Sequence, residues 1–306
     1  MNKGVSLMND RIGIIGYGAM GSRMGRRILG AGMPLTVYDI APATLERAHN
    51  DGADPAPSIA ALVNACSLVI TMLPEPAHVE AVVLGDDGLL KHAKPGTLLC
   101  EMSSSYPPVT RRLHALLKAE GIEMIDAPVS GGIQGAEAGT LTVMVGGDPE
   151  LMERARPALE AIGKNLVHVG GIGSGHVLKA LNNLLSAVTN AAAAEVTTLA
   201  VRNGIAADTA INVFATSSGR SRVTDFVYPN FVLTRTFNAN FALGLMRKDA
   251  DIATRLAREV DHPMLIGNLV RDIYGMAVTE FGPSADYTRI AQLYEKWAGV
   301  EMKGEA

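Results

Sequence analysis

The sequence has few cysteines and no excess of basic residues. Its two cysteines, Cys66 and Cys100, lie in or beside apolar runs and lack the neighbours of a metal site or a redox pair. They predict reduced core thiols in a cytosolic protein. The 27 Lys and Arg residues are outnumbered by 31 Asp and Glu residues, which gives a formal net charge of -4. Without a basic field to attract a polyanion, no nucleic-acid partner is expected.

A long uninterrupted apolar run is also missing. Residues 1–10 contain no such stretch, so neither a signal peptide nor a membrane anchor is expected there, and we expect this segment to be flexible. The most apolar region, residues 177–201, is interrupted by Lys179, by asparagines and by Glu195. This pattern is typical of a buried helix in a soluble protein. We therefore predict no membrane partner and a cytoplasmic location.

The chain is long enough for two domains. Its 306 residues are 48% apolar and 19% charged, as in ordinary folded proteins. Residues 1–173 alternate short apolar runs with segments of helical period, which favours a mainly parallel sheet covered on both faces. The predicted strands are 11–15, 35–39, 67–72, 97–102, 122–126, 141–145 and 166–169. The predicted helices include 20–29, 42–50, 77–83 and 107–119.

After residue 173 the strand signals stop. A long helix is predicted over 174–203, followed by shorter ones, so residues 174–306 are expected to form an all-helical domain built on that long helix. Lys179 lies near the start of the long helix. In apolar surroundings a lysine exchanges protons more readily near neutral pH, whereas the alternative is an ammonium that extends to water. Asn183 follows four residues later and therefore lies on the same helical face.

A glycine-rich loop follows the first predicted strand. The segment Gly16-Tyr17-Gly18-Ala19-Met20-Gly21 has the spacing G-x-G-x-x-G between a strand and a helix. Gly16 allows a tight turn, Gly18 lets the backbone approach a pyrophosphate, and Gly21 lets the helix pack closely on the strand. The phosphates would meet the positive end of the helix dipole. All six loop residues are therefore expected to bind a dinucleotide, in an α/β Rossmann-type doubly wound sheet followed by the all-α domain.

The second predicted strand ends in a carboxylate. Asp39 lies about twenty residues beyond the glycines, where a carboxylate accepts hydrogen bonds from ribose hydroxyls and repels a 2′-phosphate. The alternative is that Asp39 caps the helix that opens near Pro42. No arginine follows Asp39 before Arg47, so no nearby partner for a 2′-phosphate is apparent. The expected cofactor is NAD, with flavin as the competing reading of the glycine loop alone.

Four motifs in one order resemble the β-hydroxyacid dehydrogenase family, which contains 3-hydroxyisobutyrate dehydrogenase and has 6-phosphogluconate dehydrogenase as a larger relative. The first is the glycine loop. The second is Asp-Ala-Pro-Val-Ser-Gly-Gly at 126–132, and the third is Gly-x-x-x-Lys-x-x-Asn-Asn at 175–183. The fourth is Lys248-Asp249. The resemblance extends from about residue 11 to about residue 300, and it decides against flavin.

The resemblance implies how a substrate is held. Ser130, Gly131 and Gly132 match the family's substrate-binding loop, and their amides and the serine hydroxyl are suited to an anion, although an ordinary strand-to-loop turn is the alternative. The segment around Arg220 resembles one found in 3-hydroxyisobutyrate dehydrogenases. Arg220 is expected to bind a carboxylate in bidentate fashion, or else to be a solvated loop arginine.

The third motif implies the catalytic residues. Lys179 matches the family's catalytic lysine, and Asn183 is expected to hold the substrate hydroxyl or to orient the ammonium. Asn182 is expected to point elsewhere. His176 lies three residues before Lys179, but the family gives that position no catalytic role, and a partly exposed contact is expected instead. The remaining histidines lack ligand spacing, so no metal site is predicted.

Further cofactor contacts are implied by the resemblance alone. They are Leu73, Pro74, His78, Ser104 and Lys248, the last of which closes over the nicotinamide in the family. His78 is expected in the loop after Leu73-Pro74, where the family often has asparagine. Glu101 stands where the family usually has aspartate.

The function expected from these residues is that of an NAD-dependent 3-hydroxyacid dehydrogenase or reductase acting on a small 3-hydroxyisobutyrate-like acid. The rival substrates are tartronate semialdehyde, L-threonate, L-serine, sulfolactaldehyde and succinic semialdehyde. An imine reductase is less expected because Lys179 is present. A non-catalytic dinucleotide-binding interaction protein is the alternative from a different class, and Lys179 argues against it. The helical domain is expected to form a homodimer or homotetramer.

Overall fold

The computed structural model describes residues 11–304. They separate into two compact units, and the division falls between Lys179 and Ala180, inside the helix Ser174–Arg202 (α9). The boundary expected from the sequence, between residues 173 and 174, lies at the start of that helix. The flexibility expected of residues 1–10 lies outside the described residues.

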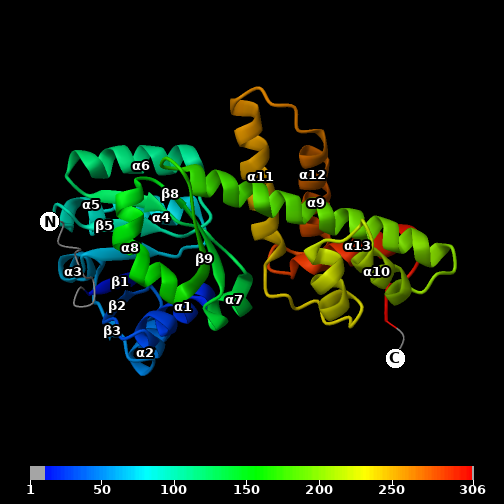
Figure 1. Ribbon diagram of the computed structural model, residues 1–306, viewed down its shortest axis with the longest axis horizontal. Helices are drawn as coiled ribbons and strands as arrows, with labels where there is room; N and C mark the ends of the chain where they lie inside the picture. The colour runs from blue at the N-terminus through cyan, green and yellow to red at the C-terminus, as the bar shows by residue number, and fades with distance from the viewer. Residues whose placement is uncertain (1–10, 305–306) are drawn as a thin grey trace. The chain divides into compact units, whose positions relative to one another are not determined.

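The first unit contains a nine-stranded sheet (Figure 1). Its strands are β1 (Ile12–Ile15), β2 (Leu35–Tyr38), β3 (Asp54–Pro55), β4 (Leu68–Thr71), β5 (Leu98–Glu101), β6 (Glu123–Asp126), β7 (Val129–Ser130), β8 (Leu141–Gly146) and β9 (Gly163–Gly170). The strands lie in the order β3-β2-β1-β4-β5-β6-β8-β7, with β9 paired to β8. The chain therefore reverses its direction of travel across the sheet at β1, which places the loop after β1 at the switch point where ligands bind in such sheets.

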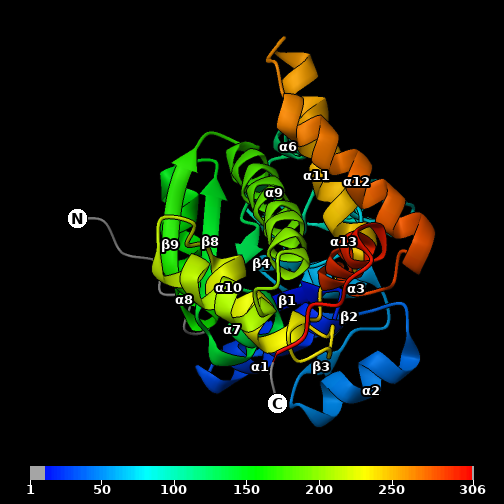
Figure 2. The same ribbon diagram turned by 90° about the vertical axis from the view of Figure 1, so that its right-hand side faces the viewer.

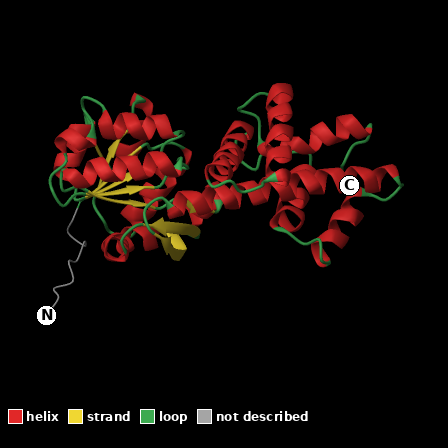
Figure 3. Ribbon diagram, turned by 90° about the horizontal axis from the view of Figure 1, so that it is seen from above, coloured by secondary structure: helices red, strands yellow, loops and turns green. Residues whose placement is uncertain are grey.

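The strands alternate their side chains between two apolar layers. Ile12 and Ile14 of β1 belong to one core cluster, whereas Ile15 belongs to the other. The first cluster is covered by α1, α2, α7 and α8, and the second by α3 to α6. Figure 3 shows the strands between these helices. The helices are α1 (Ala19–Gly30), α2 (Pro42–Asn50), α3 (Ile59–Ala65), α4 (Pro76–Leu84), α5 (Leu89–His92), α6 (Pro107–Ala119), α7 (Gly132–Ala138) and α8 (Pro149–Ile162).

Most of the predicted elements are confirmed. Helices α2 and α6 have the predicted bounds because a proline at the first helical position starts each of them. The strands β3 and β7 were not predicted, since each has two residues and depends on its neighbour for hydrogen bonds. The sheet is parallel from β3 to β6, but β8 pairs antiparallel with both β6 and β7. The last strand begins at Gly163, earlier than predicted.

The second unit is helical over the residues described. Besides the C-terminal part of α9, it contains α10 (Ala207–Thr216), the π-helix η2 (Val223–Val232), α11 (Leu243–Glu259), α12 (Leu265–Phe281), the 3₁₀ turn η3 (Tyr287–Arg289) and α13 (Ile290–Ala298). Helices α11 and α12 lie side by side (Figure 2). The core of this unit is built around Tyr228 and Tyr274, which are fully buried.

Among the described helices, α9 is the one long and apolar enough to cross a membrane by length and composition. Core helices of soluble proteins pass the same test. The buried side of α9 carries small side chains such as Ala187, Ala191 and Ala194, which let neighbouring helices approach closely.

Candidate active site

The glycine loop has the geometry of a phosphate-binding turn. Gly16 has a φ of +94°, and a side chain there would collide with the carbonyl of Met72. A Cβ on Gly21 would overlap the carbonyl oxygen of Gly16, so α1 packs directly on the loop. Gly18 differs, because a Cβ there would meet no atom within 4 Å. The space beside Gly18 is therefore open at the first backbone amides of α1. Because the N-terminus of a helix binds anions, this loop fits the pyrophosphate of a dinucleotide.

The Asp39 carboxylate lies beside this loop, at the carboxyl end of β2. Its Oδ2 accepts the Tyr17 amide at 2.8 Å, and its Oδ1 accepts the amide of Ala41, the N-cap residue of α2, at 2.9 Å. The carboxylate therefore joins the loop to the start of α2. Because a carboxylate oxygen accepts two hydrogen bonds, each oxygen retains a lone pair for a ribose hydroxyl.

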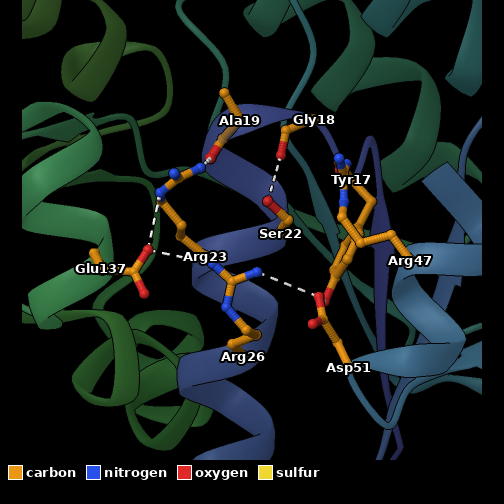
Figure 4. Close-up of polar contacts among 9 residues, drawn as sticks. All are labelled: Tyr17, Gly18, Ala19, Ser22, Arg23, Arg26, Arg47, Asp51 and Glu137. Atoms are coloured by element: carbon orange, nitrogen blue, oxygen red, sulfur yellow. Dashed lines mark hydrogen bonds and ion pairs between the residues drawn. The ribbon is translucent and has the colours of Figure 1, made fainter. Parts of the chain in front are cut away.

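Arg47 lies closer to the glycine loop than the sequence suggested. Its Nη2 donates to the carbonyl oxygen of Tyr17 at 2.5 Å, because α2 folds back along the loop (Figure 4). The arginine that follows Asp39 in the sequence thus contacts the glycine loop itself, while the expectation that a 2′-phosphate has no partner nearby stays a prediction. The buried Tyr17 ring reaches further, and its hydroxyl donates to Asp51 at 3.0 Å, while Arg26 pairs with the same carboxylate at 3.3 Å. Burial, followed by the Asp51 carboxylate, raises the pKa of Tyr17, so this hydroxyl stays protonated.

Ion pairs connect α1 with α7. Glu137 on α7 lies 2.9 Å from Arg23 Nε and 3.2 Å from Arg26 Nη2 (Figure 4). These pairs are partly exposed and contribute little stability individually. They fix α7 beside the helix that begins at the glycine loop.

The predicted substrate loop is more ordered than expected. Ser130 ends β7, Gly131 has a φ of +137°, and Gly132, with a φ of +64°, starts α7. A short helix therefore follows the strand directly, within the segment that matches the family's substrate-binding loop. Two successive glycines at positive φ make this abrupt change of direction possible.

Other predicted cofactor residues follow β4 and β5. Strand β4 pairs with β1 and β5 pairs with β4, all in parallel register, so their carboxyl ends share one edge of the sheet with the glycine loop. The Leu73 amide donates to the Ser103 hydroxyl at 2.9 Å, Pro74 is exposed, and Ser104 is half-buried. His78 is exposed in the first turn of α4. The prediction that it lies in the loop is wrong, because Pro76 starts the helix before it.

The first turn of α9, which precedes Lys179, is fastened to the sheet. Asp126, the last residue of β6, accepts the amide of Gly173 at 2.6 Å and that of His176 at 2.8 Å. This carboxylate caps the helix from another element. A Cβ on Gly175 would overlap the carbonyl of Met144 and lie 2.8 Å from Asp126 Oδ2. The glycine of the Gly-x-x-x-Lys motif thus lets α9 lie against the sheet edge, and Lys179 follows one turn later, half-buried.

His176 is buried, and the prediction of a partly exposed contact is wrong. Its Nε2 lies 2.8 Å from Glu101 Oε2 and 3.0 Å from the Ser103 carbonyl, and its Nδ1 lies 2.8 Å from the Thr110 hydroxyl. Burial acts to lower the pKa of His176, but the carboxylates of Glu101 and Asp126 and the Ser103 carbonyl raise it above its ordinary value. The signal in the sequence was the pair of carboxylates at the ends of two adjacent predicted strands.

The second unit brings the third and fourth motifs together. Asn183 Nδ2 donates to Asp249 Oδ2 at 2.6 Å, and Lys248 Nζ lies 3.5 Å from Asp249 Oδ1. Asn183 and Asp249 are buried. Asn182 is exposed and donates to Asn183 Oδ1 at 3.2 Å, so it supports its neighbour. The amide of Asn183 is thereby fixed one helical turn after Lys179.

The remaining predicted groups have contacts of their own within each unit. Arg220 is exposed, and its Nε lies 2.6 Å from Asp225 Oδ2. Cys66 and Cys100 are free and buried, and burial raises the pKa of Cys66 to about 11. Across residues 11–304, no group of His, Cys, Asp and Glu side chains is arranged to hold a metal ion.

These features define the class of the protein. A doubly wound sheet with an open glycine loop at its switch point, followed by a helical unit, is the architecture of a nicotinamide-dinucleotide oxidoreductase. Two family models then match successive parts of the chain. Residues 11–170 match the NAD-binding domain of 6-phosphogluconate dehydrogenase, and residues 173–294 match the NAD-binding domain of NADP-dependent 3-hydroxyisobutyrate dehydrogenase. The chain belongs to the β-hydroxyacid dehydrogenase family.

Individual relatives agree over nearly the whole length. An NAD-dependent L-serine dehydrogenase of Pseudomonas aeruginosa is 37% identical, covering 94% of this chain and 99% of that protein. A 3-hydroxyisobutyrate dehydrogenase of the same organism is 34% identical, over 92% and 98%. The solved structure of Mycobacterium tuberculosis 3-hydroxyisobutyrate dehydrogenase with L-serine is 31% identical and superimposes with a TM-score of 0.85, covering 93% of this chain and 98% of that one.

These comparisons confirm the predicted family, fold class and reaction class. The chain is an NAD(P)-binding dehydrogenase of small hydroxy acids. The alternative of a non-catalytic interaction protein is not supported, because the relatives are named as enzymes.

Proposed function

We propose that the protein is an NAD-preferring dehydrogenase of a small 3-hydroxy acid and that Lys179 is its general acid and base. The observation that carries this proposal is the fastening of α9 to the carboxyl edge of the sheet by Asp126, which lies at the same edge as the glycine loop. Lys179 follows the fastened turn. A proton-transferring group gains most when its backbone is held rigidly beside the reacting atoms.

Bound NAD supplies the hydride acceptor. In oxidation, the neutral amine of Lys179 takes the proton of the substrate hydroxyl while the hydride leaves the carbon that bears this hydroxyl. In reduction, its ammonium returns that proton to the forming alkoxide. The Asn183 amide, held by Asp249, orients the hydroxyl from the next turn of α9. The amides of Ser130, Gly131 and Gly132 bind the substrate carboxylate, with Arg220 as a further counter-charge.

The cofactor contacts belong to the same proposal. The loop from Gly16 to Gly21 binds the pyrophosphate, and Asp39 binds the adenosine ribose, which favours NAD over NADP. The remaining contacts are assigned by their place at the strand ends and by the family resemblance to Leu73, Pro74, His78, Ser104 and Lys248.

A 3-hydroxyisobutyrate-like acid is the substrate we propose, and L-serine is the second candidate. Both have a three-carbon chain with a carboxylate at C1 and a primary hydroxyl at C3. They differ at C2, which carries a methyl group in 3-hydroxyisobutyrate and an ammonium group in L-serine. L-Serine is favoured by the name of the Pseudomonas relative and by the ligand of the Mycobacterium structure. Measuring kcat/KM with both compounds, L-threonate and the rival semialdehydes separates the candidates.

Replacement of Lys179 tests the catalytic role. Lys179→Ala is expected to lower kcat by at least about 100-fold, since general acid-base catalysis contributes about that much, while the dissociation constant for NAD stays within a few-fold. Isothermal titration calorimetry with NAD measures the latter. Turnover near that of the wild type would refute the assignment.

A homodimer or homotetramer in the cytoplasm completes the proposal. Large apolar side chains are exposed on α9 and α12, among them Leu185, Leu199 and Leu269, each more than 60% exposed. Such surfaces are typical of subunit interfaces. Light scattering gives the number of subunits directly. Buried, unpaired thiols at Cys66 and Cys100 suit a reducing compartment.

A further inference from the structure

A buried polar cluster in the first unit includes Asp126, which holds the start of α9, but the proton and hydride transfers described above involve none of its members directly. Three of its members are ionisable, namely Glu101 at the end of β5, Asp126 at the end of β6, and His176 on α9. All three are at most 1% exposed. Burying charged groups is costly unless they compensate one another, so such a cluster needs a physical reason.

The two carboxylates are neighbours in the sheet. Glu101 and Asp126 are paired residues of the parallel strands β5 and β6. Both oxygens of Asp126 are used by α9, since Oδ1 accepts the Gly173 amide and Oδ2 the His176 amide. Glu101 Oε1 accepts the Ser103 amide at 2.8 Å, which leaves Oε2 facing His176. Two carboxylates this close in a dry interior repel each other strongly, so a cation between them is favoured.

Hydrogen-bond roles indicate that His176 is that cation. Its Nε2 faces two acceptors, the Glu101 carboxylate and the Ser103 carbonyl, and must therefore carry a proton. Its Nδ1 lies 2.8 Å from the Thr110 hydroxyl oxygen, and the same hydroxyl lies within donating distance of the Tyr106 carbonyl oxygen, at 3.4 Å. That hydroxyl can then accept a second imidazole proton. With Asp126 Oδ2 at 3.7 Å from Nδ1, the imidazolium lies between both carboxylates.

We propose that His176, held as an imidazolium between Glu101 and Asp126, is a positioning residue for Lys179. Asp126 fixes the backbone at the start of α9, and Glu101 fixes the side chain of His176, one turn before Lys179. The direction in which the Lys179 side chain extends from the helix is thereby restricted. This inference rests on the proposed role of Lys179. His176, to which the family resemblance assigns no catalytic role, thus anchors the turn of α9 that precedes Lys179.

The length of Glu101 fits this role. Its carboxylate spans the Ser103 amide and the imidazole at 2.8 Å each. The aspartate usual in the family would be shorter by one carbon–carbon bond, about 1.5 Å, and would not reach both. The length of the glutamate side chain therefore suits the distance to the His176 imidazole.

Few other charged groups face the imidazole within the first unit. Helix α6 contributes Thr110 and, one turn further, His114, whose pKa is lowered by burial, so that it is neutral near pH 7. Cys100 on β5 is kept as a thiol because burial, with Glu101 and Asp126, raises its pKa. Arg111 lies against Gly173. With His176 charged, the cluster formed by Glu101, Asp126 and His176 has a net charge of about -1.

Substitutions that change this charge in opposite directions test the proposal. His176→Gln leaves the cluster at about -2, and Glu101→Gln leaves it near zero. Each is expected to lower kcat by about 10- to 100-fold, because small misplacements of a catalytic group have effects of that size. KM for the hydroxy acid and the dissociation constant for NAD are expected to change less than about threefold, since neither residue contacts a ligand.

The pH profile distinguishes positioning from simple loss of packing. In the profile of kcat against pH, the limb governed by ionisation of Lys179 is expected to move to higher pH in His176→Gln and to lower pH in Glu101→Gln. The expected shift is about half a pH unit or more, because a negatively charged cluster stabilises the ammonium form of the lysine. The double variant restores the charge of -1 and is expected to return the limb to the wild-type position. His168→Gln, on an exposed strand residue, is the matched control and should change nothing.

Three results would overturn the proposal. They are a kcat for His176→Gln within threefold of wild type, limbs that shift in the same direction in both single variants, and a neutral imidazole. The last is measured on the intact wild-type protein by ¹⁵N NMR of labelled histidine at pH 7, so it holds even if the variants fail to fold. An active Lys179→Ala would remove the proposed function itself, whereas an inactive Lys179→Ala beside a normal His176→Gln removes only this inference.

Discussion

Gly175 offers the sharpest prediction about this fold, because two physical effects oppose each other there. It lies in the first turn of α9, and alanine is a better helix former than glycine by up to about 1 kcal/mol. On helix propensity alone, Gly175→Ala should stabilise the protein. The structure predicts the reverse, since a Cβ at this position would overlap the Met144 carbonyl and lie 2.8 Å from Asp126 Oδ2.

The expected size of the loss follows from what the methyl group displaces. To admit it, α9 must move away from β6 and β8, which weakens the two hydrogen bonds that Asp126 accepts from Gly173 and His176. A hydrogen bond to a charged group contributes about 1.5–3 kcal/mol, and overpacking costs about 1–3 kcal/mol. If the weakening equals the loss of one such bond, subtraction of about 1 kcal/mol of helix propensity leaves a fall in the free energy of unfolding of about 1.5–5 kcal/mol. Because Lys179 moves with the turn, kcat should fall by about 100-fold.

The assay is urea denaturation followed by circular dichroism, together with steady-state kinetics. Gly30→Ala is the matched control, since Gly30 is the last residue of α1 and a Cβ there meets no atom within 4 Å. That variant should be unchanged or slightly stabilised, by at most about 1 kcal/mol. If Gly175→Ala behaves like Gly30→Ala, with normal kcat, the close contact between α9 and the sheet does not restrain the catalytic turn.

Two further predictions concern the cofactor and pH. Asp39→Ala should raise kcat/KM for NADP relative to NAD by about 10-fold or more, because a carboxylate that repels the 2′-phosphate is removed. Arg47→Ala removes the hydrogen bond to the Tyr17 carbonyl and should weaken the binding of both dinucleotides alike. An unchanged ratio of NADP to NAD activity in Asp39→Ala contradicts the ribose assignment. The raised pKa of His176 makes its contribution to stability complete below its unfolded pKa of about 6.5 and lost as pH rises through the higher folded value. The free energy of unfolding should therefore decrease above pH 6.5 in the wild type and be flatter in His176→Gln, as measured by denaturation at several pH values.

Features that depend on local chemistry could be predicted from the residues alone. The bounds of α2 and α6 follow from prolines at their first positions, and the turn after β1 follows from Gly16 and Gly21. The alternation of strands and helices was sufficient for the doubly wound sheet, because each element signals its type within a few residues. The motifs around Gly18 and Lys179 were sufficient for the family, and hence for a hydroxyacid dehydrogenase that uses a nicotinamide cofactor.

Contacts between residues far apart in the chain depend on tertiary packing and could not be predicted in this way. The strands β3 and β7 form because a neighbouring strand supplies their hydrogen bonds. A segment of two residues carries no sequence pattern from which a strand could be predicted. Arg47 reaches the glycine loop because α2 turns back. His176 is buried because β5 and β6 end side by side beneath the start of α9, which joins groups 50 and more residues apart in the chain. Local preference acts within a turn or a strand, whereas burial and charge compensation depend on the packing of the whole unit.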